Sequence, residues 1–245
     1  MEFSLELLTT LRAAARVAVL TGAGISAESG IPTFREAQTG LWAQYAPTEL
    51  ATPDAFRRNP KLVWEWYAWR RELVARAAPN PGHFALAEME QQIRSFTLIT
   101  QNIDSLHQRA GSINVIELHG NIVRTKCFNE GTVVDTWTSD EIPPRCPHCN
   151  GYLRPDVVWF NESLPADALR TAYETAASAE VFFSIGTSAA VQPAASLPVL
   201  AHQNGAVTVE INPVSTSLTH QMTHVLTGKA GESLPELVRV VWGIK

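Results

Sequence analysis

Short apolar segments recur along this chain and constrain its fold more than any other feature. Most of them have four to six residues, are nearly all apolar and are rich in β-branched side chains. Strands that helices cover on both faces have this composition, because neither face meets water. Helical patterns lie between several of these segments, for example over residues 164–179. We therefore predict an open parallel α/β sheet with strands at residues 17–20, 96–100, 115–118, 181–185, 206–211 and 225–226.

Two longer segments interrupt this alternation of strands and helices. Residues 40–95 show no strand pattern and are rich in Trp, Tyr and Arg, whereas residues 121–156 contain all three cysteines and several prolines. We predict a helical insertion for the first segment and a metal-binding insertion for the second, together forming a small domain. The large domain then consists of residues 1–39, 96–120 and 157–245. A chain of 245 residues is long enough to divide in this way.

The overall charge and composition exclude several classes of protein. Hydrophobic residues make up 45% of the chain and charged residues 18%, which is typical of a folded globular protein. A net charge of −5 provides no broad basic surface, so we expect no specific nucleic-acid binding. The first ten residues do not resemble a signal or transit peptide, and no apolar run is long enough to cross a bilayer. We therefore expect a cytoplasmic protein that does not contact membranes.

A glycine-rich segment, Gly22-Ala23-Gly24, follows the first predicted strand directly. Glycines between a strand and a helix let backbone N–H groups approach a phosphate, which the positive end of the helix also attracts. A tight turn packed under the helix is the alternative interpretation. A dehydrogenase would need a second strand about twenty residues later that ends in an acidic residue. Residues 40–47 fit neither requirement, so the segment favours a nucleotide site but not hydride transfer.

Short motifs follow one another along the chain in order: Gly22-Ala23-Gly24-Ile25-Ser26, Gly30-Ile31-Pro32-Thr33-Phe34-Arg35, Thr100-Gln101-Asn102-Ile103-Asp104, Leu118-His119-Gly120, Arg154-Pro155, Val157-Val158-Trp159-Phe160, Gly186-Thr187-Ser188 and Glu210-Ile211-Asn212. This ordered set resembles the sirtuins, the NAD-dependent protein deacylases. The resemblance covers nearly the whole chain. It implies a Rossmann-like NAD domain with a smaller helical and zinc-ribbon-like module, NAD as co-substrate and acyl-lysine proteins as substrates.

The resemblance also implies a reaction. In sirtuins, the acyl oxygen of the substrate attacks the C1′ carbon of the NAD ribose as nicotinamide departs. A histidine then takes a proton from a ribose hydroxyl, and water finally releases lysine and acyl-ADP-ribose. His119 occupies the position of this histidine, and an imidazole that titrates near neutral pH suits a general base. A single histidine at a strand end is more often structural, but the motif Gln101-Asn102-Ile103-Asp104 favours catalysis.

The same resemblance describes how the NAD site is assembled. Asn102 and Asp104 hold the nicotinamide amide and the ribose, and they complete the catalytic set with His119. Asn102 and Asp104 could instead cap a helix that begins near residue 105. Phe34 shields the reacting carbon, and Arg35 lines the loop that closes on NAD. The full predicted NAD-binding set is Gly22, Ala23, Gly24, Thr33, Phe34, Arg35, Gln101, Asn102, Ile103, Asp104, Gly186, Thr187, Ser188, Asn212 and Ala230.

Residues 62–71 form a predicted helix that is informative about the acyl group. Tyr67 and Arg70 are three residues apart, so they project from one face of this helix. A phenol and a guanidinium that converge on a cleft form a carboxylate receptor, because Arg can pair bidentately with carboxylates. In sirtuins this pair marks members that prefer succinyl- and malonyl-lysine, which implies weaker deacetylation here. A surface Arg above a partly buried ring is the alternative. The resemblance adds Val157, Trp159 and Phe160 to the predicted substrate-binding residues.

The cysteines depart from the sirtuin pattern at one position. A zinc ribbon has two Cys-x-x-Cys pairs separated by about fifteen to twenty residues. Cys146 and Cys149 form one pair, but the other contains only Cys127, with Glu130 where the fourth cysteine belongs. Because zinc also accepts carboxylate oxygen, we predict a Cys3Glu site. The alternatives are His148 or Asp135 as the fourth ligand, or cysteines that simply pack together.

Two other functions fit the same scaffold. An NAD glycohydrolase or ADP-ribosyltransferase would yield ADP-ribose or ADP-ribosylated protein rather than acyl-ADP-ribose. A non-catalytic NAD sensor would not need His119, Asn102 and Asp104, and their presence together argues against it. We therefore expect a monomeric NAD-dependent protein deacylase that removes succinyl and malonyl groups.

Overall fold

The structure is a computed structural model and describes residues 2–33 and 45–244. Within these residues, six parallel strands form one sheet in the order β3-β2-β1-β6-β7-β8. This confirms the predicted parallel α/β sheet, and each observed strand overlaps its predicted range. The strands are β1 (Arg16–Thr21), β2 (Ser95–Thr100), β3 (Val115–Glu117), β6 (Val181–Ile185), β7 (Val207–Asn212) and β8 (His224–Thr227).

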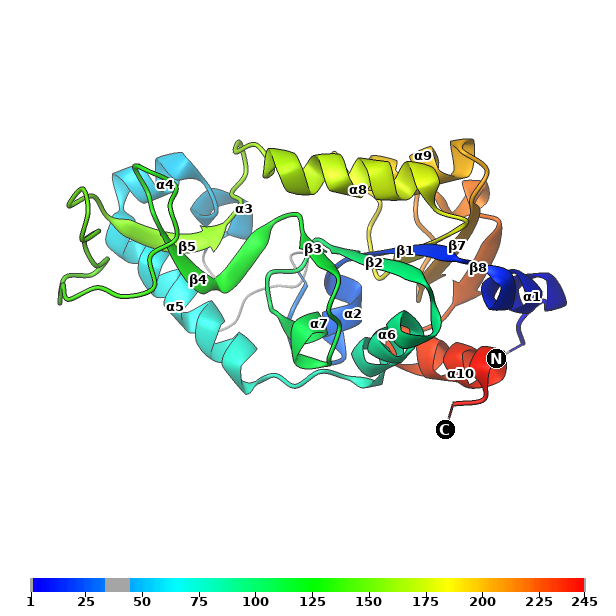
Figure 1. The fold of residues 1–245 in the computed structure, drawn as a ribbon. Helices are drawn as coiled ribbons and strands as arrows, with labels where there is room; N and C mark the ends of the chain where they lie inside the picture. The colour runs from blue at the N-terminus through cyan, green and yellow to red at the C-terminus, as the bar shows by residue number, and fades with distance from the viewer. Residues whose placement is uncertain (1, 34–44, 245) are drawn as a thin grey trace.

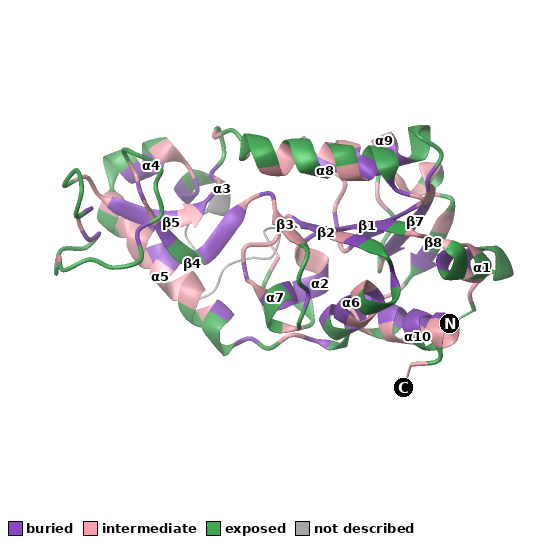
Figure 2. Ribbon diagram, viewed as in Figure 1, coloured by how far each residue is buried: buried purple, intermediate pink, exposed green. Residues whose placement is uncertain are grey.

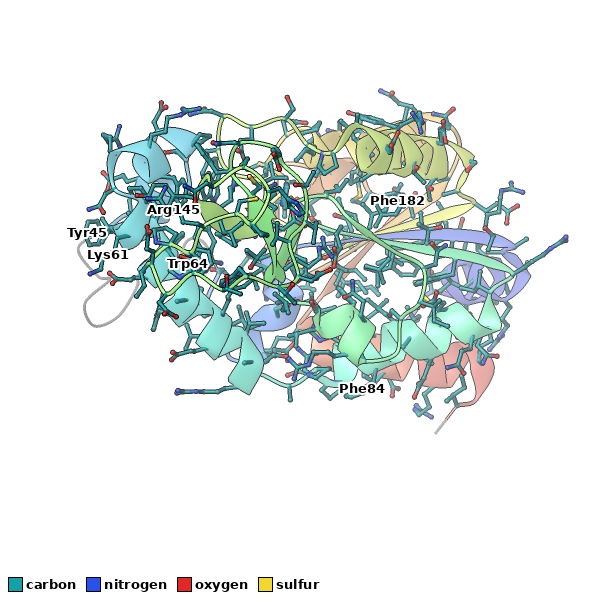
Figure 3. All side chains as sticks on the ribbon, turned by 60° about the vertical axis from the view of Figure 1, so that its left-hand side comes forward. Tyr45, Lys61, Trp64, Phe84, Arg145 and Phe182 are labelled. Carbon is teal, nitrogen blue, oxygen red and sulfur yellow. The ribbon has the colours of Figure 1, made fainter. Side chains whose placement is uncertain are left out.

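Helices cover both faces of this sheet, with α8 (Ala166–Ser178) and α9 (Leu197–Gln203) on one face and α6 (Pro81–Gln92) and α10 (Ala230–Trp242) on the other (Figure 1). Phe182, labelled in Figure 3, packs with Ala172 and Ala176 of α8, whereas Leu86 and Leu234 pack with the opposite face. Figure 2 shows the strands buried between these layers. The remaining helices near the sheet are α1 (Leu5–Ala13), α2 (Ala23–Ala27), α7 (Leu106–Arg109) and two 3-10 turns, Ala194–Ser196 and Thr219–Gln221.

A smaller group of elements lies beside the sheet, at the left of Figure 1. It contains an antiparallel pair, β4 (Gly120–Cys127) and β5 (Leu153–Val157), together with α3 (Pro47–Leu50), α4 (Pro53–Arg58) and α5 (Pro60–Arg76). Phe56, Trp66 and Trp159 are buried in its core. The predicted fold, a parallel sheet with a smaller module, is confirmed. In the described part of the chain, no helix is both long and apolar enough to cross a membrane.

Helix α6 belongs by sequence to the segment that we expected to form the helical insertion. In the structure it packs against α10 and contributes Leu86 and Met89 to the apolar cluster of the large sheet. The elements before it, α3 to α5, pack with β4 and β5 instead. The domain boundaries at residues 39, 95, 120 and 156 stay predictions.

Local signals set where two helices near the site begin. The side chain of Asn80 accepts a hydrogen bond from Gly82 N–H at 3.0 Å, and Pro81 occupies the first helical position of α6. The side chain of Asn59 accepts the N–H of Leu62 at 3.1 Å at the start of α5. Such caps satisfy N–H groups that have no partner within the helix. They define the registers of the helices that flank the carboxyl edge of the sheet.

Candidate active site at the carboxyl edge of the sheet

The loops that follow β1 and β6 approach each other very closely. A Cβ atom on Gly22 would lie 2.8 Å from the carbonyl oxygen of Gly186, and one on Gly24 would lie 2.7 Å from the Gly186 Cα. Gly186 has a φ of +60°, and a Cβ there would lie 2.5 Å from the Ile25 nitrogen. All three positions therefore require glycine. The contact lies where the strand order reverses, which is where open α/β sheets bind ligands.

Asn102, Ser26 and Asp104 form one hydrogen-bonded group next to this glycine loop. Ser26 Oγ donates to Asp104 Oδ2 at 2.7 Å, and Asn102 Nδ2 donates to Ser26 Oγ at 3.1 Å. The same amide donates to the carbonyl of Gly22 at 3.1 Å. Asp104 also accepts the N–H of Leu106 at 2.9 Å, so it caps the following turn as well. Burial raises the pKa of Asp104, while the bonds from Leu106 and Ser26 lower it.

His119 lies between β3 and β4, and its Nδ1 is 2.9 Å from the carbonyl oxygen of Gln101. A carbonyl oxygen can only accept, so Nδ1 carries the proton of the neutral ring. Burial lowers the pKa of His119, and the bond to Gln101 raises it. Nε2 therefore has an available lone pair near neutral pH, as a general base requires. The N–H of Val158 donates to the carbonyl of His119 at 2.9 Å, which places the end of β5 beside this histidine.

Three predicted NAD-binding residues lie at the ends of β6 and β7. Asn212 is the last residue of β7, and its Nδ2 donates to the carbonyl of Thr187 at 2.9 Å. Thr187 is buried, and its hydroxyl lies 3.2 Å from that of Ser184. Ser188 follows as a half-buried residue. The structure thus brings these residues to the same edge as the glycine loop.

The remaining predicted NAD-binding positions lie at the margins of this edge. Thr33 is half-buried in the segment that follows α2, and Ala230 is the first residue of α10, after β8. The residue after Ala230, Gly231, donates its N–H to Glu28 at 2.9 Å. The predicted residues 34 and 35, Phe and Arg, lie outside the residues that the structure describes.

The predicted acyl-binding pair lies on α5, next to β5. Trp159 Nε1 donates to the hydroxyl of Tyr67 at 3.0 Å, and burial raises the pKa of Tyr67 to about 12. The Arg70 guanidinium lies 5.0 Å from the ring centroid of Trp66 and 5.7 Å from that of Tyr67. Burial lowers the pKa of Arg70, whereas Tyr67 and Asp104 raise it.

A buried ion pair holds the segment that follows β5. Arg154 is 3% exposed and binds both carboxylate oxygens of Glu162, at 2.5 and 3.0 Å. Glu162 also accepts the N–H of Trp159 at 2.8 Å, and the Arg154 guanidinium lies 3.2 Å from the Trp159 ring centroid. The pKa of Glu162 is lowered overall, because the hydrogen bonds and charge of Arg154 outweigh the effect of burial, which raises it. Val157 is buried next to this pair, whereas the ring of Phe160 is 42% exposed.

A cluster of metal-ligand side chains lies at the ends of β4 and β5: Cys127, Glu130, Cys146 and Cys149. Their ligand atoms all lie within 4.8 Å of one another, and the sulfurs of Cys127 and Cys149 are 3.4 Å apart. Two sulfurs on a tetrahedral zinc are expected about 3.8 Å apart. Glu130 N–H donates to the Cys127 sulfur at 3.4 Å, and the backbone N–H groups of Cys149 and His148 lower the pKa of Cys146. This donor set fits structural zinc, and His148 and Asp135 are not members of the cluster.

Sequence reasoning missed a set of buried polar residues behind the site. Thr21 and Thr100 end adjacent strands and are hydrogen-bonded at 2.8 Å. His107 Nε2 lies 2.9 Å from the Thr21 hydroxyl, and the His107 and His83 rings contact each other at a tilt of 52° with their centroids 4.8 Å apart. Asn80 donates to the carbonyl of Ile25 at 2.7 Å. The sequence did contain one indication of this set. Thr21 follows one apolar predicted strand and Thr100 ends another, so their hydroxyls would lie at the same edge of a parallel sheet.

The fold and this edge are typical of α/β proteins that bind a nucleotide where the strand order reverses. The Sir2 family profile matches residues 22–193 of the chain. The NAD-dependent protein deacylase of Aquifex aeolicus is 58% identical over 205 residues, which cover 83% of this chain and 85% of that protein. NAD-dependent protein deacylase 1 of Pseudomonas aeruginosa is 48% identical over 238 residues, 94% and 95% of the two chains. This chain therefore belongs to the Sir2 family.

Solved structures agree with this membership. The crystal structure of a Sir2 homolog–NAD complex matches with a TM-score of 0.91 and 49% identity, and the match covers 98% of this chain and 94% of the other. A Sir2 homologue in complex with 2′-O-acetyl ADP ribose matches with a TM-score of 0.90 and 48% identity, covering 98% and 96%. The predicted family and the prediction of an enzyme that uses NAD are confirmed, and the cluster of Cys127, Glu130, Cys146 and Cys149 fits the predicted structural zinc.

Proposed function

We propose that this enzyme uses NAD to remove succinyl and malonyl groups from protein lysines, and removes acetyl groups more slowly. The names of the relatives support deacylation. The preference for acidic acyl groups is carried by one observation, the placement of Tyr67 and Arg70 on the same face of α5, beside Trp159. Val157, Trp159 and Phe160 provide the neighbouring surface for the acyl-lysine.

NAD is held along the carboxyl edge of the sheet in this proposal. Asn102 and Asp104 hold the nicotinamide end, because Ser26 and Gly22 already orient their polar atoms. Gln101, on the ribose, and Ile103 belong to the same motif as Asn102 and Asp104, and the glycines after β1 face the phosphates. Asn212, Thr187, Gly186, Ser188 and Ala230 hold the adenosine end. Phe34 and Arg35 close over the nicotinamide end, and this part of the proposal rests on the sequence resemblance alone.

His119 acts as the general base. Its Nε2 accepts a proton from a ribose hydroxyl, while its Nδ1–H remains bonded to the carbonyl of Gln101. That bond stabilises the imidazolium that forms, because a carbonyl dipole favours the charged ring. The contact between Val158 N–H and the His119 carbonyl keeps the segment proposed to hold the acyl-lysine beside the base.

A carboxylate at the end of the acyl chain gains most from Arg70. The guanidinium lies against the rings of the buried residues Trp66 and Tyr67, and a charged bond beside apolar groups is less screened by water. The phenol of Tyr67 stays protonated, because burial raises its pKa to about 12, so it can donate to the same carboxylate. An acetyl group has no carboxylate, so it can make neither the contact with Arg70 nor the one with Tyr67.

Arg70→Met tests this receptor. We expect kcat/KM for succinyl- and malonyl-lysine peptides to fall by a factor that corresponds to about 1.5–3 kcal/mol, the typical value for a charge-assisted hydrogen bond. Activity on acetyl-lysine peptides should change little, because the acetyl group has no carboxylate. The measurement is the rate of deacylated peptide formation for each acyl group at fixed NAD concentration.

Arg76→Met is the matched control, since Arg76 is an exposed cation at the end of the same helix, 3.6 Å from Glu72. It should leave the ranking of acyl groups unchanged. Equal losses on succinyl and acetyl peptides in Arg70→Met would contradict the receptor, and so would a wild-type enzyme that prefers acetyl-lysine.

A further inference from the structure

A continuous series of hydrogen bonds connects His107, in α7, with His119. The hydroxyl of Thr21 donates to that of Thr100 at 2.8 Å, so the Thr21 oxygen is left to accept from His107 Nε2 at 2.9 Å. Thr100 Oγ1 also accepts the backbone N–H of Asn102 at 3.0 Å. Thr21, Thr100 and His107 are at most 3% exposed, which shields these bonds from competing water.

One peptide group joins this series to the proposed base. The N–H of Asn102, which Thr100 accepts, and the carbonyl of Gln101, which His119 Nδ1–H contacts at 2.9 Å, belong to the same peptide unit. A peptide unit is planar and rigid, so a rotation that breaks one bond also misaligns the other. The preceding N–H, that of Gln101, donates to the carbonyl of Thr21 at 3.0 Å. This bond fixes the adjacent Thr100–Gln101 peptide unit to β1.

We propose that Thr100, supported by Thr21 and His107, is a positioning residue that orients the Gln101–Asn102 peptide and, through it, the ring and tautomer of His119. The inference rests on the role of His119 as base in the proposed function. No titration of His107 is required, because burial and the neighbouring His83 hold its pKa well below the usual value and its ring stays neutral. The single ring proton is then available to the Thr21 hydroxyl.

The threonine hydroxyls have an effect beyond filling space. The Thr21 hydroxyl occupies one lone pair of the Thr100 oxygen and the Asn102 N–H occupies the other, so two donors fix the position of this oxygen. The Gln101 carbonyl then faces His119 Nδ1 and selects the tautomer whose Nε2 is free. A histidine in the other tautomer would present an N–H where the ribose hydroxyl must lose its proton, and it could not act as the base.

Thr100→Val removes the hydroxyl and keeps the shape of the side chain. We expect kcat for the best acyl-peptide to fall about tenfold, the size of one misaligned hydrogen bond in a catalytic group, while KM for NAD and peptide changes less than about threefold. Thr100→Ser restores the hydroxyl and should recover kcat to within about threefold of wild type. A purely structural role would lower the melting temperature of both variants without separating kcat from KM.

The tautomer is measured independently of activity. In ¹⁵N-histidine-labelled protein, assigned with the aid of His119→Gln, the wild-type shifts of residue 119 should report a proton on Nδ1. Thr100→Val and Thr21→Val should both increase the Nε2–H form or broaden the signals. If His119→Ala keeps full activity, the proposed base is wrong; that outcome is distinct from an unchanged tautomer in Thr100→Val, which overturns the positioning role.

Thr208→Val is the matched control. Thr208 is a fully buried threonine near the amino end of β7, a strand of the same sheet that pairs with neither β1 nor β2, and its hydroxyl lies 3.2 Å from that of Thr223. It should cost stability without altering kcat or the His119 signals. If Thr100→Val does not fold, Thr21→Val tests the proposal by the same measurements of kcat, KM and the His119 tautomer. Wild-type kcat together with a wild-type tautomer in the folded variant would overturn the proposal.

Discussion

His119 and Asp104 are shifted in opposite directions by the same cause. Burial lowers the pKa of the histidine and raises that of the carboxyl group, because both lose the water that stabilises their charged forms. Hydrogen bonds from Leu106 and Ser26 partly offset this effect at Asp104, and the Gln101 carbonyl does so at His119. These neighbours come from separate segments of the chain, so the protonation states belong to the assembled site.

The pH dependence of catalysis follows from the lowered pKa of His119. The base works only when deprotonated, so kcat should decrease as the pH falls, with an acid limb centred below the ordinary histidine value of 6.5. His119→Ala should lower kcat about 10²–10⁴-fold, the usual contribution of acid–base catalysis. The pH profile and the effect of His119→Ala are both measured as the rate of acyl-ADP-ribose release, followed by chromatography. An acid limb centred above pH 6.5, or ADP-ribose as the main product, would contradict this assignment.

The antiparallel pair β4 and β5 brings the metal ligands together. Cys127 ends β4, Glu130 lies in the turn after it, and Cys146 and Cys149 precede β5. The spacing predicted these residues as ligands, but their convergence needs the pairing of Cys127 with Leu153 across the two strands. Glu130 is exposed, and its carboxylate is a harder donor than the thiolate that it replaces.

Zinc retention should therefore depend on residue 130. Glu130→Ala should release zinc to a chelator faster than wild type and lower the melting temperature, because the site keeps only three protein ligands. Glu130→Cys should hold zinc more tightly than wild type. His148→Ala, the control, should behave as wild type, since His148 is outside the cluster. The readouts are zinc per chain by elemental analysis and the rate of chelator-induced release; zinc loss in His148→Ala but not in Glu130→Ala would reverse the ligand assignment.

The whole fold buries two histidines whose rings are in contact, His83 and His107, with no more than 1% of either exposed. Burial lowers the pKa of His83 to about 4 and that of His107 well below its usual value. Between pH 6.5 and 4 the unfolded chain therefore binds protons that the folded chain does not, so the free energy of unfolding decreases as the pH falls through this range. The His83 contribution alone amounts to about 3 kcal/mol at pH 4.

Urea unfolding at pH 7.5 and pH 4.5 measures this dependence. His83→Gln should reduce the loss of stability between the two pH values, although it lowers stability at pH 7.5 because the Asn80 N–H loses its bond to Nδ1. His202→Gln, which changes an exposed histidine on α9, should leave the dependence unchanged. The same pH dependence in wild type and His83→Gln would show that other groups control acid unfolding.

Local patterns were sufficient for the strands, the glycine loop and the identities of the candidate zinc ligands. Buried strands have to be apolar on both faces, and Gly22 and Gly24 have to lack a Cβ. Both requirements restrict residues that are close together in the sequence, so the sequence shows them directly. The identity of the family followed from the same ordered motifs. None of these conclusions needed distant residues to be placed in space.

Tertiary structure alone decided which groups meet at the carboxyl edge. Ser26 joins Asn102 to Asp104 across more than seventy residues, and the Thr100 hydroxyl reaches His119 only through a shared peptide unit. Helix α6 packs against α10 rather than with α5, although it follows α5 in the chain. Hydrogen bonds and packing depend on distance in space, and separation along the chain carries little information about that distance.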